Sequence, residues 1–169
     1  MKSTLLIFFA CCAGLSAQIP GGSFAGEAKQ AYSRIETNLL RAAEKAPEAD
    51  YSFRATPEVR PFGELIAHVV QVQNRICGII LGTSKPSPAP GDTKADLVAA
   101  LKASNENCDA AYSSINDSNQ AEVVGSGFFK HSRLGLLELN LQHDNEMYGT
   151  MAVYMRLKGL VPPSSEKKK

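Results

Sequence analysis

The sequence lacks an excess of charge of either sign, and this narrows the classes of function. Lys and Arg number 18 while Asp and Glu number 17, which gives a formal net charge of +1. The one dense basic run is 167–169, which follows Pro162-Pro163 and has the composition of a solvated tail. This pattern predicts no binding to nucleic acid or to an anionic membrane surface.

Long hydrophobic runs are also missing, except near the start. Lys2 precedes the apolar run 5–13, and Gly14-Leu15-Ser16-Ala17 follows it, which is the order of a secretory signal. That run has about ten residues, whereas a permanent membrane span needs about 20. We predict that residues 1–17 are a signal peptide cleaved after Ala17, and that the mature protein is exported to the periplasm or beyond with no membrane attachment. Lipid attachment at Cys11 or Cys12 is the alternative, and the residues before Cys11 fit it poorly.

Few cysteines and a modest length limit the mature chain further. Removal of the leader leaves about 150 residues, enough for one domain with its own core. Of the four cysteines, Cys11 and Cys12 leave with the leader, so Cys77 and Cys108 remain. In an oxidising compartment the two thiols are candidate disulfide partners. Burial as two small core residues is the alternative.

Strand signals and internal repeats are absent. There is no useful alternating run and no Asn-Gly or Asp-Gly pair between apolar runs. Apolar residues instead recur at steps of three or four, the period of one helical face, as in Tyr32, Ile35 and Leu39. The sequence predicts four helices joined by long connections, one of which is 116–129; the helices cover residues 23–45, 61–82, 93–115 and 132–158.

Local chemistry marks the ends of these helices. Pro61 suits the first position of the second helix. Gly82 and Gly159 suit the left-handed residue that follows a helix. Thr93 and Asp96 form a start that resembles a capping box, with Asp in place of the usual Glu.

Four helices of this length bury their apolar faces best as a bundle, so we predict an all-α fold over residues 18–163 with a disordered basic tail at 164–169. Cys77 and Cys108 lie at similar depths in the second and third predicted helices. They share a height only if those helices are parallel, because antiparallel helices would separate them by roughly 15 Å. The prediction is an up-down-down-up bundle with long crossover connections, and a Cys77–Cys108 bridge is its sharpest consequence.

Histidines are few, and two of the three lie on predicted helices. His68 flanks the apolar stripe of the second helix, and His143 shares a face of the fourth with Asn140 and Met147. His131 is expected to be exposed. A histidine near an apolar face is commonly a hydrogen-bonded core residue, but helix bundles also build metal sites from inward-facing side chains of different helices.

Three segments carry a resemblance to a known family: residues 51–68, 143–149 and 154–163. They include Phe-Gly-Glu-Leu-x-x-His at 62–68 and Leu-Lys-Gly-x-x-Pro-Pro at 157–163. Together they resemble the DinB-like (DinB/YfiT) superfamily over essentially the whole mature chain. The resemblance implies a four-helix bundle of the crossing type and a divalent metal, such as Zn, Ni or Fe, held by three histidines.

In that family one ligand comes from the second helix and two from the fourth at a spacing of four, so His68 and His143 match and Met147 stands at the third position. A thioether is a poor ligand for these ions and prefers copper(I). Three hypotheses remain open. The site is lost and Met147 fills the core; Glu146 or water takes the vacant place; or His68, His143 and Met147 bind a soft metal. Asn140 would orient an imidazole from behind or hydrogen-bond within the bundle.

No nucleophile motif accompanies these residues, since Gly125-Ser126-Gly127 has the composition of a flexible loop and not of a strand-to-helix elbow. The leading hypothesis is an exported DinB-like protein with a vestigial or altered metal site, acting on an unknown small molecule. Two alternatives stand beside it: a metal-dependent hydrolase or thiol transferase using the pocket around His68 and His143, and a non-catalytic binding or dimerisation module, for which a homodimer is the candidate assembly.

Overall fold

The fold is known from a computed structural model that describes residues 23–83 and 91–167. Within these residues the chain forms four α-helices and one short pair of strands: α1 (Phe24–Lys45), α2 (Phe62–Leu81), α3 (Lys94–Ser114), β1 (Val123–Val124), β2 (His131–Ser132) and α4 (Arg133–Leu157). Single 3₁₀ turns lie at η1 (Glu48–Asp50), η2 (Gly127–Phe129) and η3 (Pro163–Ser165). The predicted all-α bundle is confirmed, while the predicted signal peptide at 1–17 lies outside the described residues.

Hydroxyl side chains begin three of the helices. The Ser23 hydroxyl accepts a hydrogen bond from the Gly26 amide, and the Ser132 hydroxyl accepts one from the Gly135 amide. Thr93 accepts from the Asp96 amide and donates to the Asp96 carboxylate, which closes the capping arrangement predicted there. These bonds satisfy amides that have no partner inside their own helix.

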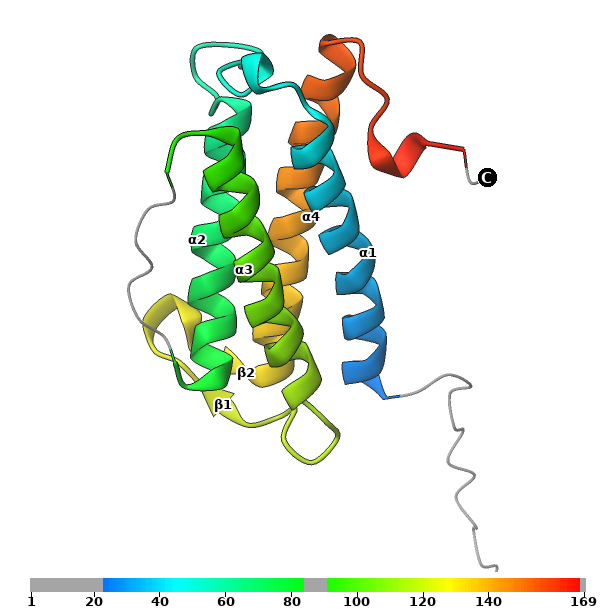
Figure 1. Ribbon diagram of the computed structural model, residues 1–169. Coiled ribbons are helices and arrows are strands. Elements are labelled where there is room, and N and C mark those ends of the chain that lie inside the picture. Colours follow the sequence, from blue (N-terminus) through cyan, green and yellow to red (C-terminus); the bar gives the residue numbers. More distant parts are fainter. Residues whose placement is uncertain (1–22, 84–90, 168–169) are drawn as a thin grey trace, which may run out of the picture.

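The helices are arranged up, down, down and up, so α2 and α3 run side by side in the same direction (Figure 1). The chain leaves α2 at Gly82, whose φ of 68° is the left-handed conformation that glycine adopts readily. It enters α3 at the opposite end of the bundle. A disulfide joins Cys77 and Cys108, with their Cα atoms 5.1 Å apart, as parallel helices at equal height allow.

Each helix packs against two neighbours around one core. The main contacts join α2 to α3 and α4, and α1 to α3 and α4, so α2 and α4 are adjacent. The core includes the fully buried residues Tyr32, Leu39, Ile66, Leu101, Leu136, Leu137 and Met151. Because α2 and α4 are neighbours, His68 and His143 lie on helices that share an interface.

The C-terminal segment is more ordered than the sequence indicates. Residues 163–165 form η3, and the Glu166 carboxylate pairs with Arg41 and with Lys45 of α1. The Tyr148 hydroxyl also accepts a hydrogen bond from the backbone amide of Ser164, at 2.9 Å. The predicted disorder is therefore wrong for residues 164–166, because contacts with α1 and α4 fix them; 168–169 lie outside the described residues.

The connection between α3 and α4 also contains a feature that the sequence did not predict. Val123 pairs with Ser132 and Val124 with His131 in a two-residue antiparallel ladder. The Arg133 side chain fixes this loop to the bundle, because it donates to Glu122 at 2.8 Å and to the Ile80 carbonyl at 2.7 Å.

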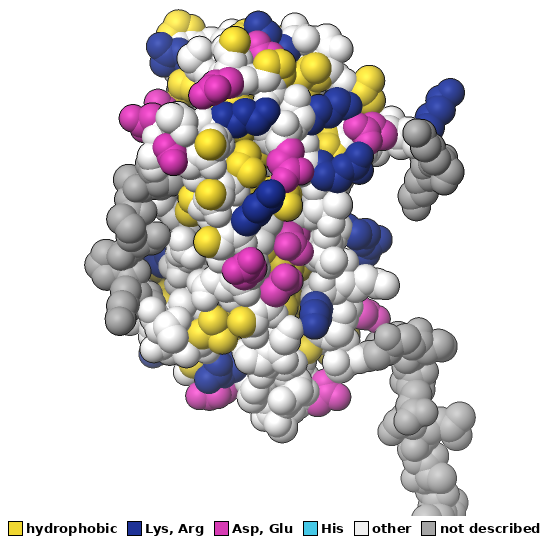
Figure 2. Space-filling view, viewed as in Figure 1, with side chains coloured by type: hydrophobic (Ala, Val, Ile, Leu, Met, Phe, Trp, Pro, Cys, Tyr) yellow, Lys and Arg dark blue, Asp and Glu magenta, His cyan; other side chains and the backbone are white. Residues whose placement is uncertain are grey.

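The surface carries mixed charge. Figure 2 shows Lys and Arg side chains beside Asp and Glu side chains over the upper half of one face, where the C-terminal segment meets α1. Over residues 23–83 and 91–167, no helix combines the length and the apolar character that a membrane span requires.

Candidate functional site

The imidazoles of His68 on α2 and His143 on α4 face each other across the interface of the two helices. Their ring centroids are 4.9 Å apart and the ring planes cross at 69°, an edge-to-face contact. The His143 side chain is 16% exposed and His68 is partly buried. The structure therefore brings together two histidines that are 75 residues apart in the sequence.

Both ring nitrogens of His143 are buried and have no hydrogen-bond partner among the described residues. A complementary atom, Oδ1 of Asp144, lies 3.6 Å from Nδ1, just beyond hydrogen-bond distance. Buried polar atoms are nearly always paired, because losing water without a replacement partner is costly. The two ring nitrogens of His143 therefore retain the capacity to bind a ligand or to form a hydrogen bond.

Met147 lies one turn beyond His143 on the same side of α4 and is 8% exposed. Glu146, the other candidate for the third ligand position, is exposed to solvent. In the described part of the chain, no three His, Cys, Asp or Glu side chains gather as a metal-binding group. The donor set at the interface is therefore two imidazoles, with a thioether in the next turn.

The surroundings of His68 favour its neutral form. Burial lowers the pKa of His68, and the nearby His143 and Arg60 lower it further, while the charge of Glu146 acts in the opposite direction. A neutral imidazole has the free lone pair that a metal or a proton needs. The electrostatics of the site therefore keep His68 available as an acceptor near neutral pH.

Asp144 is the residue that sequence reasoning missed. Its carboxyl group is completely buried, and its Oδ2 accepts hydrogen bonds from Gln73 at 2.9 Å and Asn140 at 3.1 Å. Gln73 in turn accepts a hydrogen bond from Ser104 at 2.6 Å, so the chain of contacts joins α4, α2 and α3. Burial raises the pKa of Asp144, and the neighbouring His143 ring together with the hydrogen bonds from Gln73 and Asn140 partly opposes this.

The remaining predicted residues are placed differently. Among the described residues, no hydrogen bond joins Asn140 to an imidazole: its amide donates to Asp144 and lies 3.5 Å from the Tyr112 hydroxyl. It therefore hydrogen-bonds within the bundle, the second of its two predicted roles. His131 is exposed, with Nε2 3.0 Å from the Phe128 carbonyl oxygen, and takes no part in the site.

Tyr32 adds another polar atom to this interior. Its ring stacks on Tyr112 with centroids 4.2 Å apart, and its hydroxyl is buried without a partner among the described residues. Burial raises the pKa of Tyr32, and the charge of Asp144 raises it further. The polar groups around Asp144 thus extend towards α1.

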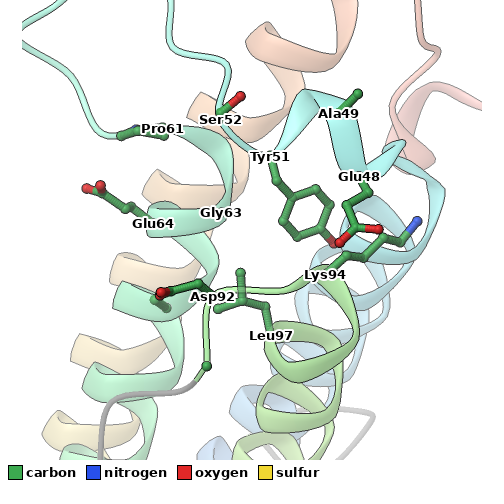
Figure 3. A pocket seen from close by; sticks show the side chains of 12 residues that line it. Glu48, Ala49, Tyr51, Ser52, Pro61, Gly63, Glu64, Asp92, Lys94 and Leu97 are labelled. Carbon is green, nitrogen blue, oxygen red and sulfur yellow. The ribbon is translucent and has the colours of Figure 1, made fainter.

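A separate cavity of about 440 Å³ opens between the starts of α2 and α3 and η1. Figure 3 shows Glu64 and Glu48 at opposite sides of it, with Tyr51 and Leu97 between them. Two of its polar groups are already engaged, since the Tyr51 hydroxyl donates to the Ala43 carbonyl at 2.7 Å and Lys94 donates to backbone carbonyls of α1 and its C-cap. Neither histidine lines this cavity, so it is distinct from the imidazole pair.

Two solved structures have the same fold. A DinB-like protein from Bacillus subtilis aligns with a TM-score of 0.69 and 18% identity, covering 83% of this chain and 99% of that one. A DinB-like protein from Bacillus cereus ATCC 10987 aligns with a TM-score of 0.67 and 18% identity, covering 80% and 93%. At this identity the likeness shows the fold alone. No curated protein matches the chain.

The sequence itself matches the family model of the DinB superfamily over residues 31–151, a range that contains His68, His143 and Met147. Proteins of this superfamily are generally associated with metal. The match, the four-helix topology and the structural neighbours agree, and the chain belongs to the DinB superfamily.

Proposed function

We propose that this protein is an exported DinB-like protein with an altered metal site, in which His68 and His143 are the retained ligands and Met147 stands in the third position. The observation that carries the proposal is the pair of facing imidazoles, whose ring centroids are 4.9 Å apart. Both nitrogens of His143 are buried there and have no partner in the part of the chain that the structure describes. A cation that accepts two imidazole lone pairs would satisfy that environment.

The donor set suits a transition metal, but the expected affinity is low. Two neutral imidazoles suit zinc, nickel or iron, and the thioether of Met147 adds little for these ions. Copper(I) is the ion for which all three donors are suitable. A divalent ion held with open positions would lower the pKa of a bound water or thiol.

Export has support from two independent features. The first 17 residues have the order of a secretory signal. The Cys77–Cys108 disulfide is of the kind that persists in oxidising compartments. Expression of the full chain with its own leader tests this part: the exported product should begin at Gln18, and an uncleaved product found only in the cytoplasm would contradict it.

Metal titration tests the site. Metal-free protein is titrated with Zn²⁺, Ni²⁺ and, under reducing conditions, Cu⁺, and both stoichiometry and affinity are measured for the wild type, His68→Ala and Met147→His. We expect one weakly bound ion in the wild type and its loss in His68→Ala. We expect at least tenfold tighter Ni²⁺ binding in Met147→His, a gain of about 1.4 kcal/mol or more.

The exposed histidine provides the matched control. His131→Ala removes an imidazole that lies outside the site, so it should leave the affinity unchanged. Two results would overturn the proposal: no metal bound by either the wild type or Met147→His, or binding in the wild type that survives His68→Ala.

A further inference from the structure

Two buried polar atoms on neighbouring residues of α4 have no hydrogen-bond partner among the described residues, and they lie close to each other. These atoms are Nδ1 of His143 and Oδ1 of Asp144, which lie 3.6 Å apart. Only a slight shortening of this distance is needed for a hydrogen bond. Closing this contact removes two unsatisfied atoms at once, which makes it the favoured arrangement of the pair.

The carboxyl group of Asp144 is held in place by other helices. Gln73 of α2 and Asn140 of α4 both donate to Oδ2, and Ser104 of α3 orients Gln73. With Oδ2 fixed by two donors, Oδ1 is left for the His143 ring. The Asp144 side chain has no solvent exposure, so water does not compete for this contact from the surface.

We propose that Asp144 is a positioning residue: its Oδ1 accepts a hydrogen bond from Nδ1–H of His143, which fixes the ring and its tautomer and leaves the lone pair on Nε2. A histidine held in this way presents one defined nitrogen to a ligand, and a carboxylate behind the ring makes that nitrogen more basic. The tautomer is a property of the metal-free protein, whereas the consequence for metal affinity rests on the proposed function above.

The opposite arrangement has a distinct signature. If Asp144 were the protonated partner and donated to Nδ1, the neutral ring would carry its proton on Nε2. Burial raises the pKa of Asp144 and so favours the protonated acid, while the two N–H donors on Oδ2 oppose this and favour the carboxylate. The arrangement proposed here is the one in which the group is ionised at the pH of the measurement. The position of one proton on the His143 ring thus separates the two.

The tautomer is read from the two-bond and three-bond couplings between ring protons and ring nitrogens in ¹⁵N-labelled, metal-free protein. The measurement is made near pH 8.5, about two units above the ordinary imidazole pKa of about 6.5. His68→Gln and His131→Gln assign the signals. We expect Nδ1–H in the wild type, and a switch to Nε2–H in Asp144→Asn, where the new amide would donate to Nδ1.

Asp109→Asn is the matched control, because it makes the same chemical change at an exposed position of α3 and should leave the tautomer as in the wild type. An Nε2–H tautomer in the wild type would overturn the proposal, and so would an unchanged tautomer in a folded Asp144→Asn variant. Should that variant fail to fold, the wild-type measurement decides alone.

The measurement of metal affinity is independent of the measurement of the tautomer. Loss of a partner behind a ligating histidine typically lowers metal affinity about 10–100-fold, so Asp144→Asn should weaken Ni²⁺ binding by that factor, while Asp109→Asn should not. If the wild type binds no metal, the proposed function fails while the tautomer result still stands. If the metal binds through His68 but Asp144→Asn alters neither tautomer nor affinity, only the inference about Asp144 fails.

Discussion

The two interfaces that α2 makes in this bundle differ in kind. Towards α3, α2 is joined by the Cys77–Cys108 disulfide and by the buried hydrogen bond from Ser104 to Gln73. Towards α4, it places His68 against His143, where both nitrogens of the latter lack partners among the described residues. A covalent link holds one interface, while the other leaves hydrogen-bonding capacity unused. This contrast is the reason why the proposed metal site lies at the α2–α4 interface.

Removing the disulfide should have the largest effect on stability. The bond joins residues separated by 31 positions, and closing a loop of that size is worth about 3.5 kcal/mol in the chain-entropy description. Cys77→Ala/Cys108→Ala should lower the free energy of unfolding in urea by about that amount. Alkylation of the wild type without reductant, followed by mass spectrometry, should find neither thiol modified. Two alkylated cysteines would show that no covalent bond links α2 to α3, and the contrast between the two interfaces would be lost.

Removing the Asp144 side chain should have an effect of similar size. In Asp144→Ala, the amides of Gln73 and Asn140 lose a buried acceptor, and each unsatisfied group costs roughly 1–3 kcal/mol. Asp144→Asn keeps an acceptor oxygen and should cost less, as urea unfolding of both variants will measure. Equal losses in the two variants would show that packing, and not hydrogen bonding, is what the side chain contributes.

The pH dependence of this comparison has a definite sign. Burial raises the pKa of Asp144 in the folded state above its ordinary value near 3.9, so folding favours the protonated acid. Its contribution is fully present at low pH and decreases as the pH rises from about 3.9 to the folded-state pKa. Unfolding measured at several pH values should therefore show Asp144→Asn gaining on the wild type across that window. A wild type that gains on Asp144→Asn as pH rises would contradict the assigned direction.

His68 should produce a smaller effect of opposite slope. Burial lowers its folded-state pKa below the ordinary value near 6.5, so the unfolded chain binds the proton more readily. The wild type should lose stability as the pH falls from about 6.5 towards the folded-state pKa, and His68→Gln should flatten this part of the profile. His131→Gln serves as the control. Identical profiles for the wild type and His68→Gln would show that burial does not lower the pKa of His68.

The smallest effect is expected at the C-terminal segment. Glu166→Gln removes the carboxylate that pairs with Arg41 and Lys45 on the surface of α1. Surface ion pairs contribute little to global stability. The variant should exchange the amide hydrogens of residues 165 and 166 faster, with the unfolding midpoint nearly unchanged. Unaltered exchange there would mean that Tyr148 and η3 alone hold the segment.

The helix boundaries and the topology of the bundle could be predicted from the sequence, because they depend on local chemistry and on the lengths of the connections. Thr93 and Gly82 predict helix ends from their own hydrogen-bonding and backbone preferences. The equal depths of Cys77 and Cys108 predict the parallel direction of α2 and α3. His68 and His143 were also predicted to share one interior, because each lies beside the apolar stripe of its helix.

The parts that could not be predicted depend on contacts across long sequence distances. Asp144 follows His143, and successive residues on a helix point about 100° apart, so the sequence does not show that both reach the α2 interface. Asn140 and Asp144, four residues apart on one face, were the available signal. Glu166 meets Arg41 at a separation of 125 residues, which no local pattern encodes.

The disulfide between parallel helices also closes a covalent ring. Because Cys77 and Cys108 are bonded, the 30 residues between them form a loop that is tied at both ends. A single proteolytic cut anywhere between these cysteines would therefore leave one connected molecule. The two pieces would migrate together on a denaturing gel and separate only after a thiol reagent opened the ring.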